Sequence, residues 1–453
     1  MKNRSLLLSF LFLLNLLTYM DRQVLAGVET VIAKDLLPDD PNATAKMGLC
    51  ATAFLVSYML FSPLFGVLGG RMSRWMLVGL GTIVGSVATA ASGFAGYLDS
   101  FVFLLIMRCI VGISEAAYAP VAPSILSDLY SPTERGKVLS YFYVAVPVGS
   151  ALGYALGGLA VKYASWQWAF FLLAPPGIAL GLIALFIPDR RVAPVATPPL
   201  GTQPPLKERI RQALSFRARE YRHLFSIRSY VYCCLGMTAM TFSMGAMSFF
   251  MPRYVEQRYL EQGKIGGNLG EINITFGVIV VVAGLLATLF GGYLGDKLRG
   301  RLPGSYFIVS AAGLFVSFPM ILLMLVCPFP FAWVFVFLAV FFIFFNTGPA
   351  NTILANVTSP ALRTTGFAVN IFIIHAFGDA ISPFLLGVIA DAYNMTIAFM
   401  VVSFMVFVGG VFWALGTRHL EADTAAASSS SEAVEPARLS DLPPPTTSSA
   451  PQP

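Results

Sequence analysis

Charged residues are scarce in this chain of 453 residues. They make up 11% of it, whereas an ordinary soluble domain has about 25%. Histidine occurs three times and cysteine five times, and the cysteines have neither the spacing of a disulfide framework nor that of a zinc site. These absences exclude a soluble enzyme, a disulfide-stapled secreted domain and a His-rich metal centre.

Motifs for catalysis and for ATP binding are absent as well. The sequence contains no Gly-x-Ser-x-Gly and no His-Glu-x-x-His, and Gly295-Asp-Lys lacks the Gly-Lys-Ser/Thr ending of a P-loop. The net charge of +6 is spread over short loops rather than along one basic stripe, which argues against a nucleic-acid partner. We therefore predict a protein that is not an enzyme and has no cofactor.

Apolar side chains dominate instead, at 57% of the residues with a mean hydropathy of +0.74. A bilayer core about 30 Å thick needs about 20 helical residues, and the sequence offers twelve such stretches. They are Leu6–Ile32, Met47–Leu68, Trp75–Phe94, Phe101–Leu126, Val138–Val161, Trp168–Ile187, Tyr230–Phe250, Ile272–Leu294, Tyr306–Leu325, Phe331–Leu354, Gly366–Ala390 and Ile397–Leu415.

A basic connection divides the twelve spans into two groups of six. Residues 189–228 contain nine Lys and Arg, and most of the other basic residues lie on the same side of the membrane if both termini are cytoplasmic. The positive-inside rule therefore predicts that orientation, in an inner or plasma membrane. Leu206–Tyr221 has the pattern of a basic amphipathic helix, with a solvated charged linker as the alternative. The Ala-, Ser- and Pro-rich residues 421–453 are expected to be disordered.

The two groups of spans, residues 1–188 and 229–420, repeat each other. Gly66-Val-Leu-Gly-Gly70-Arg71 matches Gly292-Tyr-Leu-Gly-Asp296-Lys297 at an offset of 226 residues, and Ser131-Pro132 matches Ser359-Pro360 at 228. We predict an all-α membrane protein made of two pseudo-symmetric six-helix bundles, which is the architecture of secondary transporters with a site between the halves.

The repeated Gly-rich loops resemble the signature of the major facilitator superfamily. Four further segments resemble its Spinster family: Asn15-Leu-Leu-Thr-Tyr-Met-Asp-Arg22, Arg108-Cys-Ile-Val-Gly-Ile-Ser-Glu-Ala-Ala-Tyr118, Pro147-Val-Gly-Ser-Ala-Leu-Gly-Tyr154 and His375-Ala-Phe-Gly-Asp-Ala-Ile-Ser-Pro383. The resemblance covers spans one to five and eleven closely and is weaker in spans seven to ten. It implies a facilitator-fold carrier of sphingosine-1-phosphate or lysophospholipids, a family in which some members are proton-coupled.

Ionisable residues inside the spans mark the candidate site, because a charge at the bilayer centre costs at least about 2.5–3.5 kcal/mol. For proton coupling we predict Asp21, Glu115 and Asp379. For substrate binding we predict Arg22, Arg108, His375 and Tyr118, with the two Arg as the only buried Lys or Arg and therefore the ligands of an anionic head. Static ion pairs and hydrogen bonds that fix the helix packing are the alternative for each of these groups.

Two geometric expectations follow from helix periodicity. Arg108 and Glu115 are seven residues apart and so lie about 10.5 Å apart along one helix face, too far to neutralise each other. His375 and Asp379 are four residues apart and can touch.

Conformational roles are expected for six residues: Gly70, Arg71, Asp296, Lys297, Gly149 and Gly153. Gly149 and Gly153 give the fifth span a small face for close helix packing. The resemblance implies an Asp at position 70 that latches the halves together on the cytoplasmic side, and Gly70 in its place predicts a weak latch.

The predicted function is secondary transport of a lysolipid-like or sphingoid amphiphile by alternating access. We expect this transport to be coupled to protons and the protein to be a monomer in the bilayer. A proton symporter for a small organic anion, a multidrug exporter, and a lipid scramblase or channel are the alternatives.

Overall fold

Within the described residues the protein consists of helices and contains no strand. The computed structural model describes residues 4–130, 138, 141–189, 220–263, 268–299, 301–359 and 362–432. The predicted linker helix over Leu206–Tyr221 lies outside them except for its last two residues, which belong to a short helix over residues 220–226. Twelve helical segments in the described part of the chain are long and apolar enough to span a membrane, as the sequence predicts.

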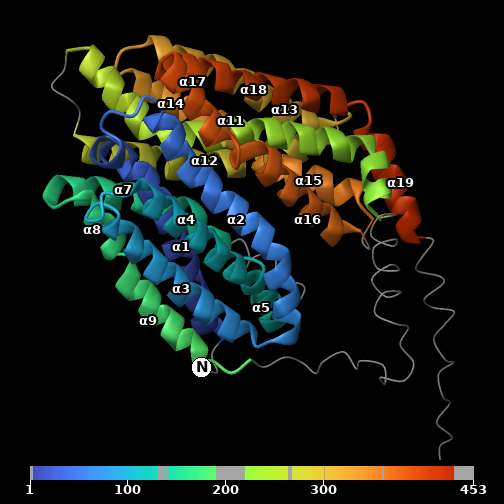
Figure 1. The fold of residues 1–453 in the computed structure, drawn as a ribbon. Helices are drawn as coiled ribbons and strands as arrows, with labels where there is room; N and C mark the ends of the chain where they lie inside the picture. The colour runs from blue at the N-terminus through green and yellow to red at the C-terminus, as the bar shows by residue number, and fades with distance from the viewer. Residues whose placement is uncertain are drawn as a thin grey trace, which may run out of the picture.

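The N-terminal bundle contains the first six spans (Figure 1). Its helices are α1 (Arg4–Leu36), α2 (Ala43–Arg71), α3 (Arg74–Phe94), α4 (Phe101–Tyr118), α5 (Val121–Leu129), α7 (Ala145–Tyr163), α8 (Trp166–Phe171) and α9 (Ala174–Leu185). Ser73 and Ser100 cap α3 and α4 by accepting hydrogen bonds from the amides of Met76 and Phe103.

The C-terminal bundle contains the other six spans. Its helices are α11 (Arg228–Glu261), α12 (Leu269–Arg299), α13 (Ser305–Val326), α14 (Ala332–Phe344), α15 (Thr347–Val357), α16 (Arg363–Ile374), the π-helix η1 (His375–Asp379), α17 (Ser382–Ala392), α18 (Met395–Gly416) and α19 (Leu420–Glu432).

Equivalent spans of the two bundles are broken at equivalent places. The fourth span stops at Tyr118 and resumes at Val121 beside Pro120, and the tenth stops at Phe344 and resumes at Thr347. These interruptions are separated by the same 226 residues as the Gly-rich loops. The repeat seen in the sequence therefore extends to the backbone.

Two helices differ from the sequence expectation. The seventh span, expected to end at Phe250, continues through Pro252 to Glu261, because the residues beyond the proline pack, with the Tyr254 ring stacked on that of Phe399 at 4.7 Å. The start of the tail expected to be disordered is also helical, in α19. Ala has the highest helix propensity, and Asp423 fixes this helix by accepting a hydrogen bond from the amide of Ser229 at 2.8 Å.

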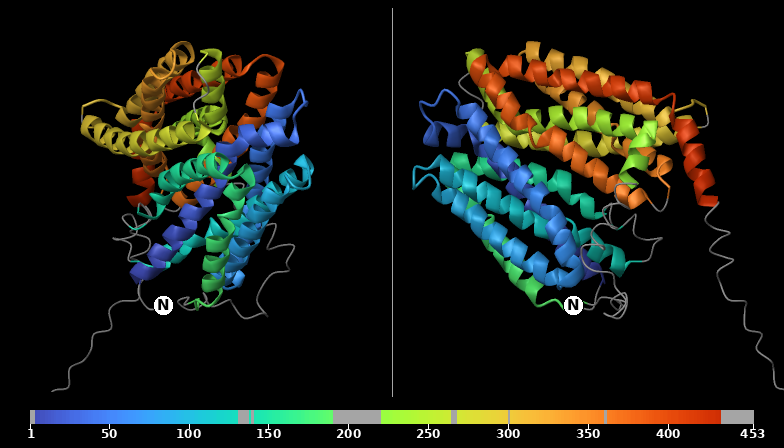
Figure 2. Two further views of the ribbon diagram at one scale, coloured as in Figure 1. Left: turned by 90° about the vertical axis from the view of Figure 1, so that its left-hand side faces the viewer. Right: turned by 45° about the vertical axis from the view of Figure 1, so that its right-hand side comes forward.

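The two bundles touch at one end of the molecule and diverge toward the other (Figures 1 and 2). We call the end where α1 begins, and where residues 189 and 220 lie, the linker end, and the end with the α1–α2 loop the far end. The described contacts between the bundles include Asn273 Nδ2 to the carbonyl of Gly27 at 2.8 Å and Tyr154 Oη to that of Ser248 at 2.8 Å, both in the far half.

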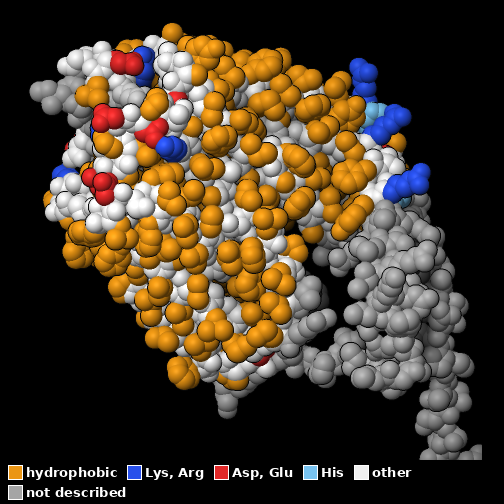
Figure 3. Space-filling view, viewed as in Figure 1, with side chains coloured by type: hydrophobic (Ala, Val, Ile, Leu, Met, Phe, Trp, Pro, Cys, Tyr) orange, Lys and Arg blue, Asp and Glu red, His pale blue; other side chains and the backbone are white. Residues whose placement is uncertain are grey.

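The surface of the bundles is mainly apolar between the two ends. In Figure 3 hydrophobic side chains cover the helices, whereas Asp, Glu, Lys and Arg gather near the ends of the molecule. Leu60, Leu289 and Phe186 are among the large apolar side chains that are exposed. Such a surface is stable in lipid and not in water, so this is a multi-pass membrane protein.

Candidate functional site

A cavity of about 180 Å³, which we call the polar cavity because charged side chains line it among apolar ones, lies between the bundles near the middle of the spans. Arg22, Phe54 and Arg108 line it from the N-terminal bundle, and Ser248 and Asp379 line it from the C-terminal bundle. Three of the predicted site residues, Arg22 of span one, Arg108 of span four and Asp379 of span eleven, thus meet at one place. A cavity between two related bundles is where a carrier holds its substrate.

Two ion pairs connect α1 with α4 beside this cavity. Arg22 donates to Glu115 from Nε at 2.9 Å and from Nη2 at 2.5 Å. Arg108 Nη2 lies 3.5 Å from an Asp21 carboxylate oxygen. As expected from their separation along α4, Arg108 and Glu115 do not pair with each other; each pairs with a residue of α1.

The surroundings of the two arginines differ. Arg108 is 1% exposed, lies 5.5 Å from the centre of the Phe170 ring and donates to Ser92 at 3.2 Å. The Arg22 side chain is 19% exposed, and its guanidinium lies 4.8–5.4 Å from the ring centres of Tyr19, Phe54 and Tyr58. Arg22 is therefore the more accessible cation, in an aromatic setting that favours cations.

Asp21 has a second partner on α3. Thr89 donates a hydrogen bond to its carboxylate at 2.9 Å, and both residues are buried. Thr89 and Ser92 are three residues apart on α3 and so share one helix face, from which they contact the two members of the Asp21–Arg108 pair.

His375 and Asp379 touch, as their spacing predicts. His375 Nδ1 lies 2.9 Å from an Asp379 carboxylate oxygen within the π-helix η1. The His375 ring is also edge-on to that of Tyr58, with 6.5 Å between the ring centres, so α2 and η1 are in contact. π-Helical turns are frequent at functional sites.

Tyr118 lies elsewhere. Its hydroxyl donates to the carbonyl of Leu11 at 3.0 Å, and its side chain is buried. It lines a second cavity inside the N-terminal bundle rather than the cavity between the bundles.

The predicted conformational residues divide into two sets. A Cβ at Gly149 or Gly153 would lie 2.6 or 2.5 Å from a carbonyl oxygen of α1, so these glycines permit the close packing of α7 on α1. Asp296 accepts a hydrogen bond from Tyr306 at 2.8 Å, and Lys297 lies 5.4 Å from the centre of the Tyr293 ring. The surroundings of Gly70 and the side chain of Arg71 are not among the parts that the structure describes, and the weak latch stays a prediction.

The sequence missed two connections at the far end. Buried Glu29 of α1 pairs with Arg253 of α11 at 2.7 Å. Asp391 of α17 accepts from the amides of Thr44 and Ala45 at the start of α2, at 3.2 and 2.7 Å. Glu29 lay within the first predicted span and so carried a signal, whereas Asp391 and α2 are far apart in sequence.

The expectation that Arg22 and Arg108 are the only buried basic residues was wrong. Arg74 is 8% exposed and pairs with Asp189 at 3.2 Å. It begins α3 directly after a short loop, where its neighbours in sequence gave no indication of burial.

The architecture is that of a two-bundle membrane carrier, and residues 11–383 match the family profile of the Major Facilitator Superfamily. "Protein spinster homolog 3" of Danio rerio is 31% identical over 437 residues, which cover 91% of this chain and 85% of that protein. "Protein spinster" of Drosophila melanogaster is 33% identical over 390 residues, 83% of this chain and 60% of that protein. The chain therefore belongs to the Spinster family of the major facilitator superfamily.

One relative's name states a substrate. It is the "Sphingosine-1-phosphate transporter SPNS2" of Danio rerio, 31% identical over 421 residues, which cover 88% of this chain and 81% of that protein. The fold also matches the crystal structure of a bacterial homolog to the human lysosomal transporter Spinster, in an inward-facing and unoccupied conformation, with a TM-score of 0.75 at 19% identity, covering 93% of this chain and 99% of that one. The predicted fold class and family resemblance are thus confirmed.

Proposed function

We propose that this transporter carries an amphiphile with an anionic head and a single apolar chain, of the lysolipid or sphingoid class. The observation that carries the proposal is the junction of two unlike cavities. The polar cavity between the bundles shares Met244 and Ser248 with an apolar pocket of about 50 Å³ inside the C-terminal bundle.

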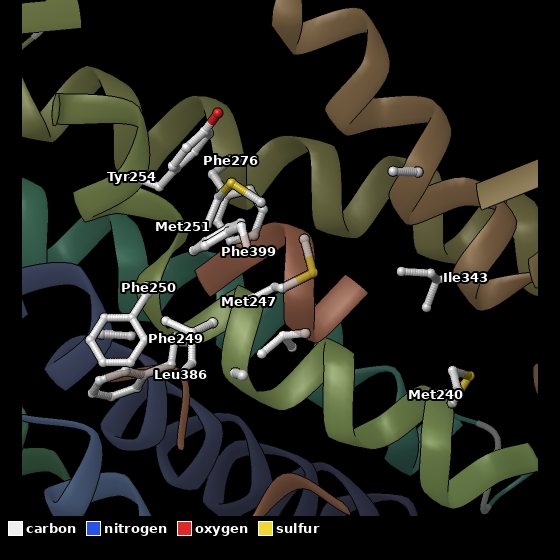
Figure 4. Packing of buried hydrophobic residues seen from close by; sticks show 14 of the residues in the cluster. Met240, Met247, Phe249, Phe250, Met251, Tyr254, Phe276, Ile343, Leu386 and Phe399 are labelled. Atoms are coloured by element: carbon white, nitrogen blue, oxygen red, sulfur yellow. The ribbon is translucent and has the colours of Figure 1, made fainter. Parts of the chain in front are cut away.

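The apolar pocket suits a hydrocarbon chain. Figure 4 shows Met247 and Met251 of α11 close to Phe276, with Ile343 of α14 nearby, and all four line the pocket. Methionine is unbranched and polarizable, and adapts to irregular apolar partners. A chain that enters here leaves its head in the polar cavity beside Arg22.

The head is held by Arg22, with Arg108 behind it. A guanidinium binds phosphate or carboxylate through two parallel hydrogen bonds. In the described conformation Glu115 occupies the Nε and Nη2 donors of Arg22. An anionic head therefore competes with Glu115 and releases a carboxylate when it binds.

This competition also supports coupling to protons. A carboxylate that loses its buried cation takes up a proton more readily. We assign the coupling proton to Asp21, whose partner Arg108 lines the same cavity, with Glu115 and then Asp379 as the next candidates. His375 holds the Asp379 carboxylate in place through their hydrogen bond.

The orientation follows from the charge distribution of the sequence. We place the linker end and both termini in the cytoplasm of a monomer in an inner or plasma membrane. The described far-end contacts then close the site on the outside and leave the bundles apart on the inside.

The test is binding and transport by the purified protein. Thermal shift with sphingosine-1-phosphate, lysophosphatidic acid, a sugar and a cationic drug should raise the midpoint for the two anionic lipids alone. In proteoliposomes the bound lipid should show counterflow. Stabilisation by a short organic anion or a drug, without any lipid effect, would favour the symporter or exporter alternative, and transport without counterflow would indicate a scramblase or channel.

A further inference from the structure

The N-terminal bundle contains a second cavity, distinct from the one between the bundles. It has about 60 Å³ and is enclosed by α1, α3, α4 and the α8–α9 span. Two of the three predicted coupling carboxylates, Asp21 and Glu115, line it. Its other polar side chains are hydroxyls, and include Thr18, Thr82, Ser86, Thr89 and Ser114.

This cavity extends from the ion pairs toward the linker end. On α1 its lining runs from Asp21 to Leu14, seven residues, or about 10.5 Å along the axis. On α4 it runs from Val111 to Tyr118, where α4 ends and α5 continues the fourth span toward the linker end, past an apolar cluster that includes Leu11 and Ile125. Three helices thus line the same depth with hydroxyls and carboxylates, which lie among apolar side chains such as Leu17 and Val111.

Water suits this cavity better than a metal ion. The two carboxylates are already neutralised by Arg22 and Arg108, so a cation finds no unpaired charge. One water molecule needs about 10–15 Å³ of such space and two to four polar partners. The volume therefore holds several waters, and the hydroxyls and carboxylates supply their hydrogen bonds.

We infer that this cavity is a hydrated path by which protons travel between the linker end and Asp21, separate from the route of the substrate. The inference rests on the proposed proton coupling. A hydronium ion in the cavity gives its proton to a carboxylate oxygen of Asp21 and remains as water, and the reverse transfer unloads it. The charged and titratable groups around Asp21 are Arg108 and Glu115 of α4, Arg22 and Tyr19 of α1, and Tyr118 at the linker side.

Hydration is tested on the wild-type protein by hydroxyl-radical footprinting with mass spectrometry. Tyr118, which lines the cavity, should be modified several-fold faster than Tyr154, which is equally buried and lies at the far-end contact of the bundles. Equal modification of the two tyrosines would mean a dry cavity and overturn the inference.

The path is tested by removing hydroxyls without changing side-chain size. In Thr18→Val/Thr82→Val we expect accumulation driven by a pH gradient to slow by about tenfold, with substrate counterflow unchanged. Thr288→Val is the matched control, because Thr82 and Thr288 each donate at 2.8 Å to a carbonyl four residues earlier in their own helix. It should accumulate substrate like the wild type.

The outcomes separate the inference from the proposed function. Wild-type protein that does not respond to a pH gradient, or that responds to a sodium gradient instead, overturns proton coupling and the path with it. A wild-type response that persists undiminished in the double variant overturns the path alone. Footprinting of the wild type shows whether the cavity is hydrated even if the double variant does not fold.

Discussion

The two six-helix bundles share one fold and bury different chemistry at their centres. In the N-terminal bundle, Asp21 and Arg108 lie within a network that includes Arg22, Glu115 and the hydroxyls of α3. At the same depth the C-terminal bundle packs methionine and phenylalanine around an apolar pocket. The two halves therefore share a scaffold while their central side chains differ, and under the proposed function the charged half binds the head and the proton and the apolar half binds the hydrocarbon chain.

Loss of the Asp21 carboxylate should have the largest effect, because it removes the function assigned to the charged half. Asp21→Asn keeps the size and hydrogen bonding of the side chain and removes its titration. We expect it to abolish accumulation driven by a pH gradient in proteoliposomes while exchange of substrate continues. Wild-type accumulation in this variant would move the proton site to Glu115 and then to Asp379.

Arg22→Lys should weaken substrate binding by about 10- to 100-fold, because the ammonium cannot make two parallel hydrogen bonds to the head. Arg108→Lys should weaken it as well. Affinity is measured by thermal shift across a titration of the lipid. Arg258→Lys is the control, since Arg258 pairs with the exposed carboxylate of Glu261 outside the cavity. Unchanged affinity in Arg22→Lys would exclude this residue from the head site.

A larger side chain in the apolar pocket of the C-terminal bundle should change which length of lipid chain the protein prefers and leave proton coupling intact. Ile343→Phe narrows the pocket in the C-terminal bundle, so each methylene that no longer fits should cost about 0.8 kcal/mol, or about fourfold in relative affinity. Competition assays with lysolipids of increasing length measure this. Ile274→Phe, on the exposed face of α12, should behave like the wild type. An unaltered preference in Ile343→Phe would place the chain elsewhere.

The smallest effect is expected at the contact of Asp391 with the start of α2, which is one of the contacts that link the halves. Asp391→Asn keeps an acceptor for one of the two α2 amides and loses the charge, and the loss of charge changes the stability by about 0.3–1 kcal/mol at a helix N-terminus. The population open at the far end should rise by about two- to fivefold. Spin labels at Leu98 and Phe331, both exposed in far-end loops, report the distance. Asp40→Asn is the control, because Asp40 bonds to Asn42 and Lys46 of its own bundle and, within the described residues, makes no hydrogen bond or ion pair with the other half. An identical shift in this control would exclude a specific role for Asp391.

Much of the fold was predictable because lipid imposes a simple rule on sequence. Runs of about 20 apolar residues can hardly be anything but spans, and the repeated Gly-rich loops gave the two bundles. The scarcity of charge also led to Asp21, Arg22, Arg108 and Glu115, each visible against an apolar background.

The partners of those charges were not predictable. Helix periodicity placed Arg108 away from Glu115, yet the pairing of Arg108 with Asp21 depends on how α1 packs against α4 across 87 residues of sequence. The hydrogen bond from Thr89 to Asp21 and the contact of Asp391 with α2 likewise depend on tertiary packing. The continuation of α11 past Pro252 shows tertiary packing outweighing a local helix-breaking signal.

Helix α19 has a practical consequence. Its hydrogen bond from Ser229 to Asp423 attaches it to the first turn of α11, and Figure 2 shows it projecting from the linker end of the C-terminal bundle. It is therefore expected to move together with the C-terminal bundle. A fluorophore on α19, paired with one on the N-terminal bundle, would convert the relative rotation of the halves into an optical signal during each transport cycle.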